Sequence, residues 1–97
     1  MRVKVIGYMK FRLIMGDQAD LELEIKQSGT LGDILDELSN RFGKEFDSLV
    51  YNGETNKVKN SIMILLNGAS YLNFYNRLNR EVKEGDRITL CPTMTGG

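Results

Sequence analysis

The sequence contains no histidine and no tryptophan, and only one cysteine and one proline. A single cysteine cannot form an internal disulfide, so nothing points to a secreted fold held together by disulfides. Zinc fingers and iron–sulfur clusters need several cysteine or histidine ligands, and a His-dependent catalytic triad needs its base. These absences argue against a metal site and against ordinary side-chain catalysis, and we expect no independent enzymatic activity.

Long apolar runs and clusters of positive charge are missing as well. No run approaches the roughly 20 residues of a membrane helix, and the 13 basic and 13 acidic residues are scattered and cancel to a net charge of zero. Nucleic acids and anionic membranes are bound by clustered Lys and Arg. The alternating start Met1–Val5 also lacks the apolar stretch of a signal peptide. We therefore expect a cytoplasmic protein that binds neither nucleic acid nor membrane.

Nucleotide-binding loops are a further absence, because neither G-x-x-x-x-G-K-[ST] nor G-x-G-x-x-G occurs. We expect no bound cofactor. The chain has 97 residues, 41% of them hydrophobic, and this length supports one core but not two. We predict a single domain over residues 1–97, with a flexible diglycine tail at residues 93–97.

The first quarter of the chain alternates between apolar and polar residues. Val3 and Val5 share one face of the first run, a second run follows at Phe11–Met15, and Gly16–Asp20 forms a turn. Leucine and glutamate alternate strictly in Leu21–Ile25, as in a half-buried strand. The pattern predicts an N-terminal β-hairpin.

A helix is predicted at residues 31–43. Thr30 and Asp33 have the spacing of a capping box, and Gly43 is a suitable C-terminal stop. One apolar stripe at helical spacing contains Leu31, Ile34, Leu35, Leu38 and Phe42.

Two further strands are predicted in the second half of the chain. Ile62–Leu66 precedes an Asn-Gly turn, and Arg87–Cys91 ends at Pro92. Residues 44–60 are less regular, and Tyr71–Asn79 connects the strands through aromatic residues that either contact the core or form a partner-binding patch; we favour the core. The order strand, strand, helix, strand, strand predicts an α+β fold in which one main helix crosses a mixed sheet.

The residues after Pro92 are small or flexible and include two glycines, Gly96 and Gly97. Such a segment buries little surface, so we expect it to extend into solvent. Glycine has no Cβ and can pass through a channel too narrow for other residues. The α-carboxylate of Gly97 is then the one unusual functional group of the tail. A frayed end or a cloning remnant is the alternative interpretation.

Several segments resemble one protein family. Thr30–Leu35 resembles the helix start T-[VL]-x-[DE]-[LV]-[LI] of molybdopterin-synthase small subunits, and Ile64–Gly68 is similar to their I-L-V-N-G turn. Glu84–Leu90 resembles D-G-D-x-[VI]-x-[IF], and the proline and diglycine of the tail match P-P-V-[SA]-G-G. In order and coverage the chain resembles the MoaD/ThiS-type sulfur carriers with the ubiquitin-like β-grasp fold, and is nearest to the molybdopterin-synthase small subunit.

The resemblance implies a function for the tail. A ubiquitin-activating-type enzyme would use ATP to convert Gly97 to an acyl-adenylate, which then becomes a thiocarboxylate. Gly96, which has no side chain, would let the tail enter the narrow channel of that enzyme. A molybdopterin-synthase large subunit would use the sulfur to build molybdopterin or tungstopterin. A modifier conjugated to lysines and a carrier for the thiazole of thiamine are alternatives. The resemblance places the partner-binding surface at Leu90, Cys91, Pro92, Thr93, Met94 and Thr95.

Cys91 departs from the family pattern, which has an aromatic residue at this position. A thiol near a sulfur-accepting tail suggests redox or persulfide chemistry, but no neighbour in the sequence would lower its pKa. Alternation with Ile88 and Leu90 places Cys91 on the opposite sheet face. We therefore predict a structural or interface position for Cys91.

Overall fold

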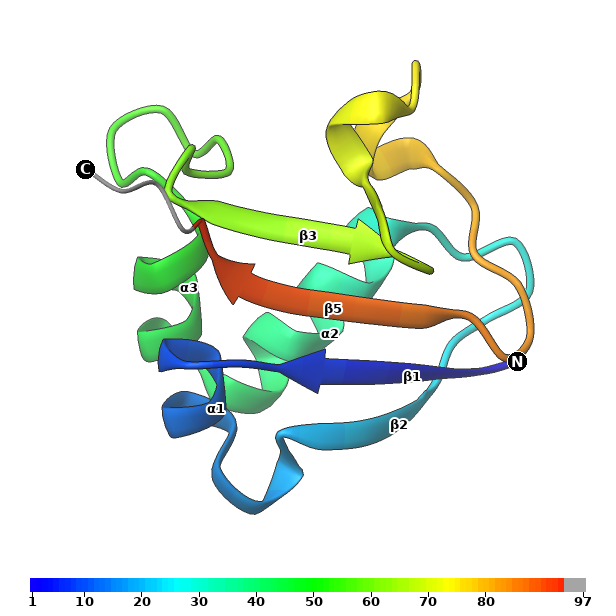
Figure 1. The fold of residues 1–97 in the computed structure, drawn as a ribbon, viewed down its shortest axis with the longest axis horizontal. Coiled ribbons are helices and arrows are strands. Elements are labelled where there is room, and N and C mark those ends of the chain that lie inside the picture. Colours follow the sequence, from blue (N-terminus) through cyan, green and yellow to red (C-terminus); the bar gives the residue numbers. More distant parts are fainter. Residues whose placement is uncertain (94–97) are drawn as a thin grey trace.

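A five-stranded sheet with the strand order β2-β1-β5-β3-β4 is the centre of the computed structural model, which describes residues 1–93 (Figure 1). Strands β1 and β5 are parallel, and every other neighbouring pair is antiparallel, so the sheet is mixed as predicted. The strands are β1 (Arg2–Gly7), β2 (Asp20–Glu24), β3 (Ile62–Leu66), β4 (Ala69–Ser70) and β5 (Arg87–Pro92).

The inner face of the sheet is apolar because alternate residues of each central strand point to the same side. Val3 and Val5 of β1, and Ile88 and Leu90 of β5, are at most 1% exposed. Every second residue of β3 from Ile62 is buried with them. The core lies between this face and the helices, which are behind the sheet in Figure 1.

The main helix, α2 (Leu31–Phe42), confirms the prediction to within one residue. The Asp33 N–H donates to the Thr30 hydroxyl at 3.2 Å, and the Thr30 N–H donates to the Asp33 carboxylate at 2.9 Å. This capping box satisfies two backbone groups that the first turn leaves without partners. Four residues of the predicted apolar stripe are buried: Leu31, Ile34, Leu35 and Leu38.

The predicted strand at Phe11–Met15 is wrong, because this segment belongs to the short helix α1 (Lys10–Met15). Phe11 and Met15 are buried four residues apart, which is the helical spacing, whereas Leu13 between them is 83% exposed. A strand would have placed all three side chains on one face. The hairpin pairing is confirmed, because β1 and β2 are antiparallel, but α1 and a 3-10 turn at Gly16–Gln18 connect them.

A third helix, α3 (Lys44–Val50), occupies part of the segment that we described as less regular. Phe46 and Val50 are fully buried, and the ring of Phe46 meets that of Phe11 edge-on at a centroid distance of 6.1 Å. This contact fixes α3 against α1. None of the helices between Met1 and Thr93 is long and apolar enough to cross a membrane.

The aromatic connection between β4 and β5 consists of 3-10 turns at Tyr71–Asn73 and Arg77–Asn79. Tyr71 and Phe74 pack against the core, as favoured from the sequence, and Arg80 lies 4.6 Å from the centroid of the Phe74 ring. Tyr75 differs, because its side chain is 94% exposed.

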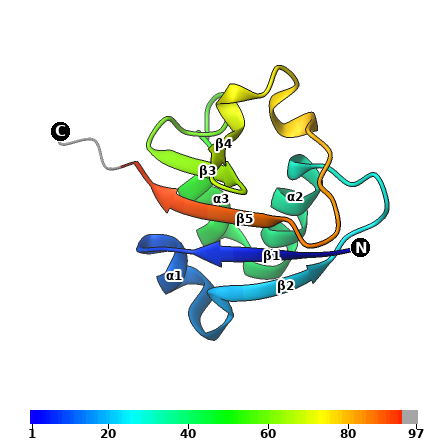
Figure 2. The ribbon, with the colours of Figure 1, turned by 45° about the vertical axis from the view of Figure 1, so that its right-hand side comes forward.

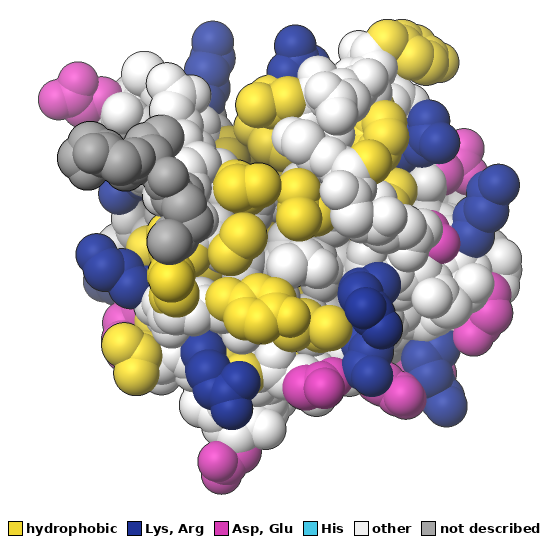
Figure 3. Space-filling view, in the orientation of Figure 1, with side chains coloured by type: hydrophobic (Ala, Val, Ile, Leu, Met, Phe, Trp, Pro, Cys, Tyr) yellow, Lys and Arg dark blue, Asp and Glu magenta, His cyan; other side chains and the backbone are white. Residues whose placement is uncertain are grey.

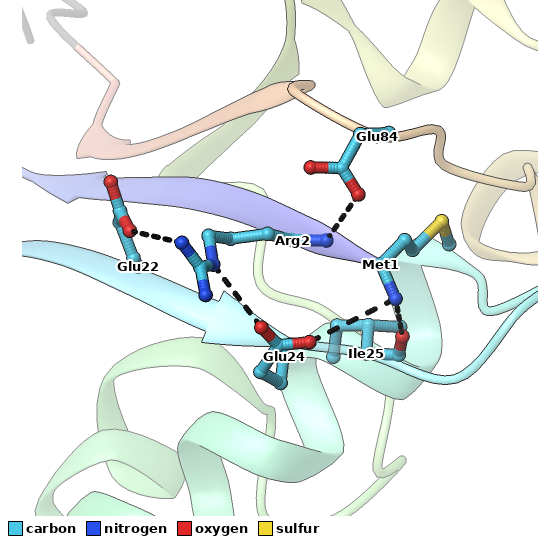
Figure 4. Close-up of polar contacts among 6 residues, drawn as sticks. All are labelled: Met1, Arg2, Glu22, Glu24, Ile25 and Glu84. Atoms are coloured by element: carbon cyan, nitrogen blue, oxygen red, sulfur yellow. Dashed lines mark hydrogen bonds and ion pairs between the residues drawn. The ribbon is translucent and has the colours of Figure 1, made fainter.

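A network of charged residues joins the strands at the end of the sheet where the chain begins (Figure 4). Arg2 of β1 contacts Glu24 at 3.1 Å and Glu22 at 3.8 Å, and its N–H donates to Glu84 at 2.8 Å. Because the Arg2, Glu22 and Glu24 side chains are 61–70% exposed, these pairs add little stability. Their exposure fits the solvated strand face expected from the alternation.

Candidate functional site

Strand β5 leads to the predicted tail from the middle of the sheet. It lies between β1 and β3, and both views show it crossing the molecule to the end where α1 and α3 lie (Figures 1 and 2). Pro92 pairs with Ile62, the first residue of β3. A central strand with partners on both sides gives the segment that follows a fixed starting point.

Backbone hydrogen bonds extend this fixed start to Thr93, the last residue that the structure describes. The Thr93 N–H donates to the Ser61 carbonyl at 2.9 Å, and the Tyr8 N–H donates to the Leu90 carbonyl at 2.9 Å. The predicted site residues Met94, Thr95, Gly96 and Gly97 lie outside the described residues.

Leu90 is placed differently from the partner-binding surface that the resemblance implies. Its side chain is 0% exposed within the core, and its carbonyl already accepts the Tyr8 N–H. A partner therefore has no access to the Leu90 side chain. The reason is strand alternation, which turns residue 90 inward and residue 91 outward.

Cys91 lies half-buried on the outer face of β5, opposite Met63 of β3. Burial raises the pKa of the thiol above its ordinary value. A raised pKa lowers the fraction of thiolate at neutral pH, and the thiolate is the nucleophile. This environment suits an interface position better than sulfur chemistry at Cys91 itself.

Apolar side chains cover the outer face of the sheet near the end of β5, and we call this region the open sheet face. It consists of Ile6, Met63, Leu65 and Cys91, all half-buried, with the 48% exposed ring of Tyr8 beside them. Figure 3 shows hydrophobic side chains gathered over this part of the sheet. Of these residues, the sequence analysis placed only Cys91 on the partner-binding surface and missed Ile6, Met63 and Leu65. The available signal was β3, whose residues 62–66 are apolar at every position rather than at every second one.

A polar pocket between α2 and α3 is separate from the open sheet face. Ser39 donates to Asp47 at 2.5 Å, and Asp36 and Tyr51 line the same pocket. Burial, followed by the carboxylates of Asp36 and Asp47, raises the pKa of Tyr51. The phenol of Tyr51 therefore stays protonated at neutral pH and does not act as a nucleophile in this pocket.

The comparisons with known proteins agree with this geometry. A model of the ThiS family matches residues 10–97. The crystal structure of SAMP1 from Haloferax volcanii superimposes with a TM-score of 0.81 at 21% identity, over 100% of both chains. A putative molybdopterin converting factor subunit 1 from Pyrococcus furiosus gives a TM-score of 0.74 at 24% identity, over 97% of this chain and 99% of that one.

A chain from the BexX/CysO complex of Amycolatopsis orientalis gives a TM-score of 0.72 at 26% identity, over 98% of this chain and 99% of that one. The comparison with curated protein sequences gave no match. The family match and the structural neighbours confirm the predicted ubiquitin-like β-grasp fold.

Proposed function

The chain belongs to the ThiS family of ubiquitin-like sulfur carriers, and from this membership we propose that it carries sulfur on Gly97 for the synthesis of molybdopterin or tungstopterin. An adenylating enzyme of the ubiquitin-activating type and a molybdopterin-synthase large subunit are its partners in this proposal. ATP is bound by the adenylating enzyme and not by this chain.

The observation that carries the proposal is the family match over residues 10–97, together with the course of β5. The backbone is hydrogen-bonded through Thr93, so Gly97 is the fourth residue beyond the fixed sheet. Four residues span at most about 14 Å when fully extended. A partner that docks on the sheet therefore meets the Gly97 carboxylate within about 14 Å of Thr93.

The chemistry consists of two substitutions. A carboxylate oxygen of Gly97 attacks the α-phosphorus of ATP, which forms the acyl-adenylate and releases pyrophosphate. A persulfide sulfur on a partner protein then attacks the acyl carbon and AMP leaves; cleavage of the S–S bond by a thiol leaves the thiocarboxylate on Gly97. Gly96 lets the tail enter a narrow channel because it has no side chain.

The open sheet face is the docking surface in this proposal. Its apolar side chains lie directly beside the strand that leads to the tail, and apolar surface of this kind gains free energy when a partner covers it. Cys91 belongs to this face, and the other predicted partner-binding residues after it, Pro92 to Thr95, follow in the sequence. A cytoplasmic location belongs to the same proposal, because the adenylation step consumes ATP.

The intact mass of the protein isolated from its host tests the proposal. Replacement of one oxygen by sulfur adds about 16 Da, and this species should disappear when Gly97 is deleted. The purified thiocarboxylate form should then convert the pterin precursor to molybdopterin when the large subunit is added.

Two other outcomes would redirect the assignment. A ladder of heavier species linked to lysines would identify a protein modifier, as the name small archaeal modifier protein describes one structural neighbour. A thiocarboxylate that supports thiazole formation but not molybdopterin formation would identify a carrier for thiamine. If an actively growing host yields neither a species about 16 Da heavier nor conjugates, activation of Gly97 is ruled out.

A further inference from the structure

Helices α1 and α3 lie next to each other and leave a shallow groove of about 680 Å³ on the surface. We call it the α1–α3 groove. Its walls and floor include Lys10, Leu13, Ile14, Lys44, Leu49 and Lys59. Because the buried rings of Phe11 and Phe46 meet directly beneath these helices, the groove has a firm base.

Positive charge predominates along the groove. Lys10, Lys44 and Lys59 contribute three ammonium groups, whereas Glu45 is the one carboxylate among its lining residues. The ion pairs found within residues 1–93 involve none of these lysines. Lys59 is held in place by donating to the Ser48 carbonyl at 2.6 Å. A chain with zero net charge thus has a local excess of positive charge here.

The floor of the groove is apolar. Leu13 is 83% exposed, the highest value among the exposed leucines, and Ile14 and Leu49 are half-buried beside it. Exposed apolar surface surrounded by charged groups is typical of a binding site. A ligand made only of phosphate groups would contact the lysines and leave Leu13 exposed. The apolar floor therefore favours a ligand that also has apolar side chains.

The groove lies at the end of the molecule from which the tail leaves. Lys59 is two residues before Ser61, whose carbonyl accepts the N–H of Thr93. Helix α1 begins three residues after Gly7, which pairs with Leu90 of β5. Figures 1 and 2 both show α1, α3 and the end of β5 together at this end of the sheet.

We propose that the α1–α3 groove binds an acidic peptide segment with apolar side chains, carried by the adenylating enzyme that takes up the tail. This inference rests on the proposed function, because it assigns a second contact to the same partner. Carboxylates of the segment pair with the three lysines while its apolar side chains cover Leu13. The contact orients the carrier and increases the rate of encounter, since complementary charge steers association.

ATP–pyrophosphate exchange with the adenylating enzyme of the source organism tests the inference. The variant Lys10→Glu/Lys44→Glu should raise the KM for the carrier about tenfold and leave kcat unchanged. Both positions begin a helix, where a carboxylate is favoured, so the fold should persist. The KM of the wild type should also rise with sodium chloride, and that of the variant should rise less.

The matched control is Lys26→Glu/Lys83→Glu, which makes the same change in net charge at the opposite end of the sheet. Its KM should stay within about twofold of the wild type, because distant exposed charges are screened. Leu13→Ser tests the apolar floor and should raise KM without lowering the melting temperature, since the side chain is exposed.

The possible failures are distinguishable. Absence of exchange with the wild-type chain overturns the proposed function, and the groove inference with it. Normal exchange by the wild type with an unchanged KM in Lys10→Glu/Lys44→Glu overturns the groove inference alone. Equal increases in KM for the groove and control variants also overturn it, because net charge and not the groove would then govern binding.

Discussion

Among single residues, Cys91 shows how burial decides chemistry. Its thiol lies on the outer face of β5, within the open sheet face, yet burial raises its pKa. With the thiol mainly protonated at neutral pH, a role in accepting sulfur is disfavoured. Cys91 contributes to the open sheet face as a small apolar side chain.

We therefore expect Cys91→Ser to retain adenylation and sulfur transfer. Iodoacetamide should alkylate the wild-type thiol more slowly than it alkylates glutathione at pH 7.5, because less thiolate is present. The alkylation rate should increase as the pH rises toward the raised pKa. A variant that folds and binds its partner normally but no longer accepts sulfur would show that the thiol takes part in the chemistry.

Gly7 is a second position where one atom matters. A Cβ built at this residue would lie 2.6 Å from the Met15 sulfur and 3.1 Å from the Cβ of Phe11. We predict that Gly7→Ala lowers the free energy of unfolding by about 1–3 kcal/mol, because it overpacks the contact between β1 and α1. Urea unfolding measures the change. Gly53→Ala is the control, since a Cβ there meets nothing within 4 Å, and equal losses in the two variants would contradict this explanation.

Among the elements, the best-predicted ones have local signals that agree with their burial. Helix α2 has a capping box and an apolar stripe, so both its start and its buried face were predictable. Helix α1 was not, because Phe11, Leu13 and Met15 alternate as in a strand and only the tertiary structure decides which of them is buried. The six residues of α1 are too few for the sequence to separate the two periods.

The candidate site, too, has a part that could be predicted from local patterns and a part that could not. The outward position of Cys91 followed from alternation along β5, and the structure has it there. The open sheet face combines residues of three strands, among them Ile6 and Met63. It depends on strand order, which a single sequence does not specify. Leu90 was placed on the contact surface by the family resemblance, but its side chain is buried. A family pattern alone does not show which residues of a strand face outward.

The capping box of α2 gives a prediction at the scale of an element. Thr30→Ala should destabilise the protein by about 1 kcal/mol, because it removes the hydroxyl that accepts the Asp33 N–H. The Thr30 N–H, followed by Lys26, lowers the pKa of Asp33. The ionised form of Asp33 is thus favoured in the folded state. Its contribution to the free energy of unfolding is present above the unfolded pKa and is lost as the pH falls through the folded pKa.

The variant Asp33→Asn tests the direction of this pH dependence. The variant should be less stable than the wild type at pH 7, and the difference should vanish at a pH below the folded pKa of Asp33. Thermal unfolding measured across this range provides the comparison. A difference that persists undiminished in acid would mean that the carboxylate charge contributes nothing and that only the shape of the side chain matters.

At the scale of the whole molecule, the fold separates stability from the proposed chemistry. The core lies between the sheet and the helices, and Leu90 is the last of residues 1–93 to belong to it. The hydrogen bond from the Thr93 N–H to the Ser61 carbonyl ends the described structure. In the proposed function, the domain holds and orients Gly97 while its partners supply the catalytic groups.

This separation gives the last prediction, which concerns the tail. Deleting Gly97, or adding one residue after it, should abolish adenylation while the melting temperature stays unchanged. Attack requires the carboxylate to come within about 3–3.5 Å of the α-phosphorus, and one residue of extended chain moves it by about 3.3–3.6 Å. Gly96→Val should fail for a steric reason, because a branched side chain does not fit a channel shaped for glycine.

ATP–pyrophosphate exchange and a melting curve, measured on the same samples, separate the loss of adenylation from a loss of stability. Normal exchange by the extended chain would contradict the proposal, and a lowered melting temperature would instead give the tail a structural role.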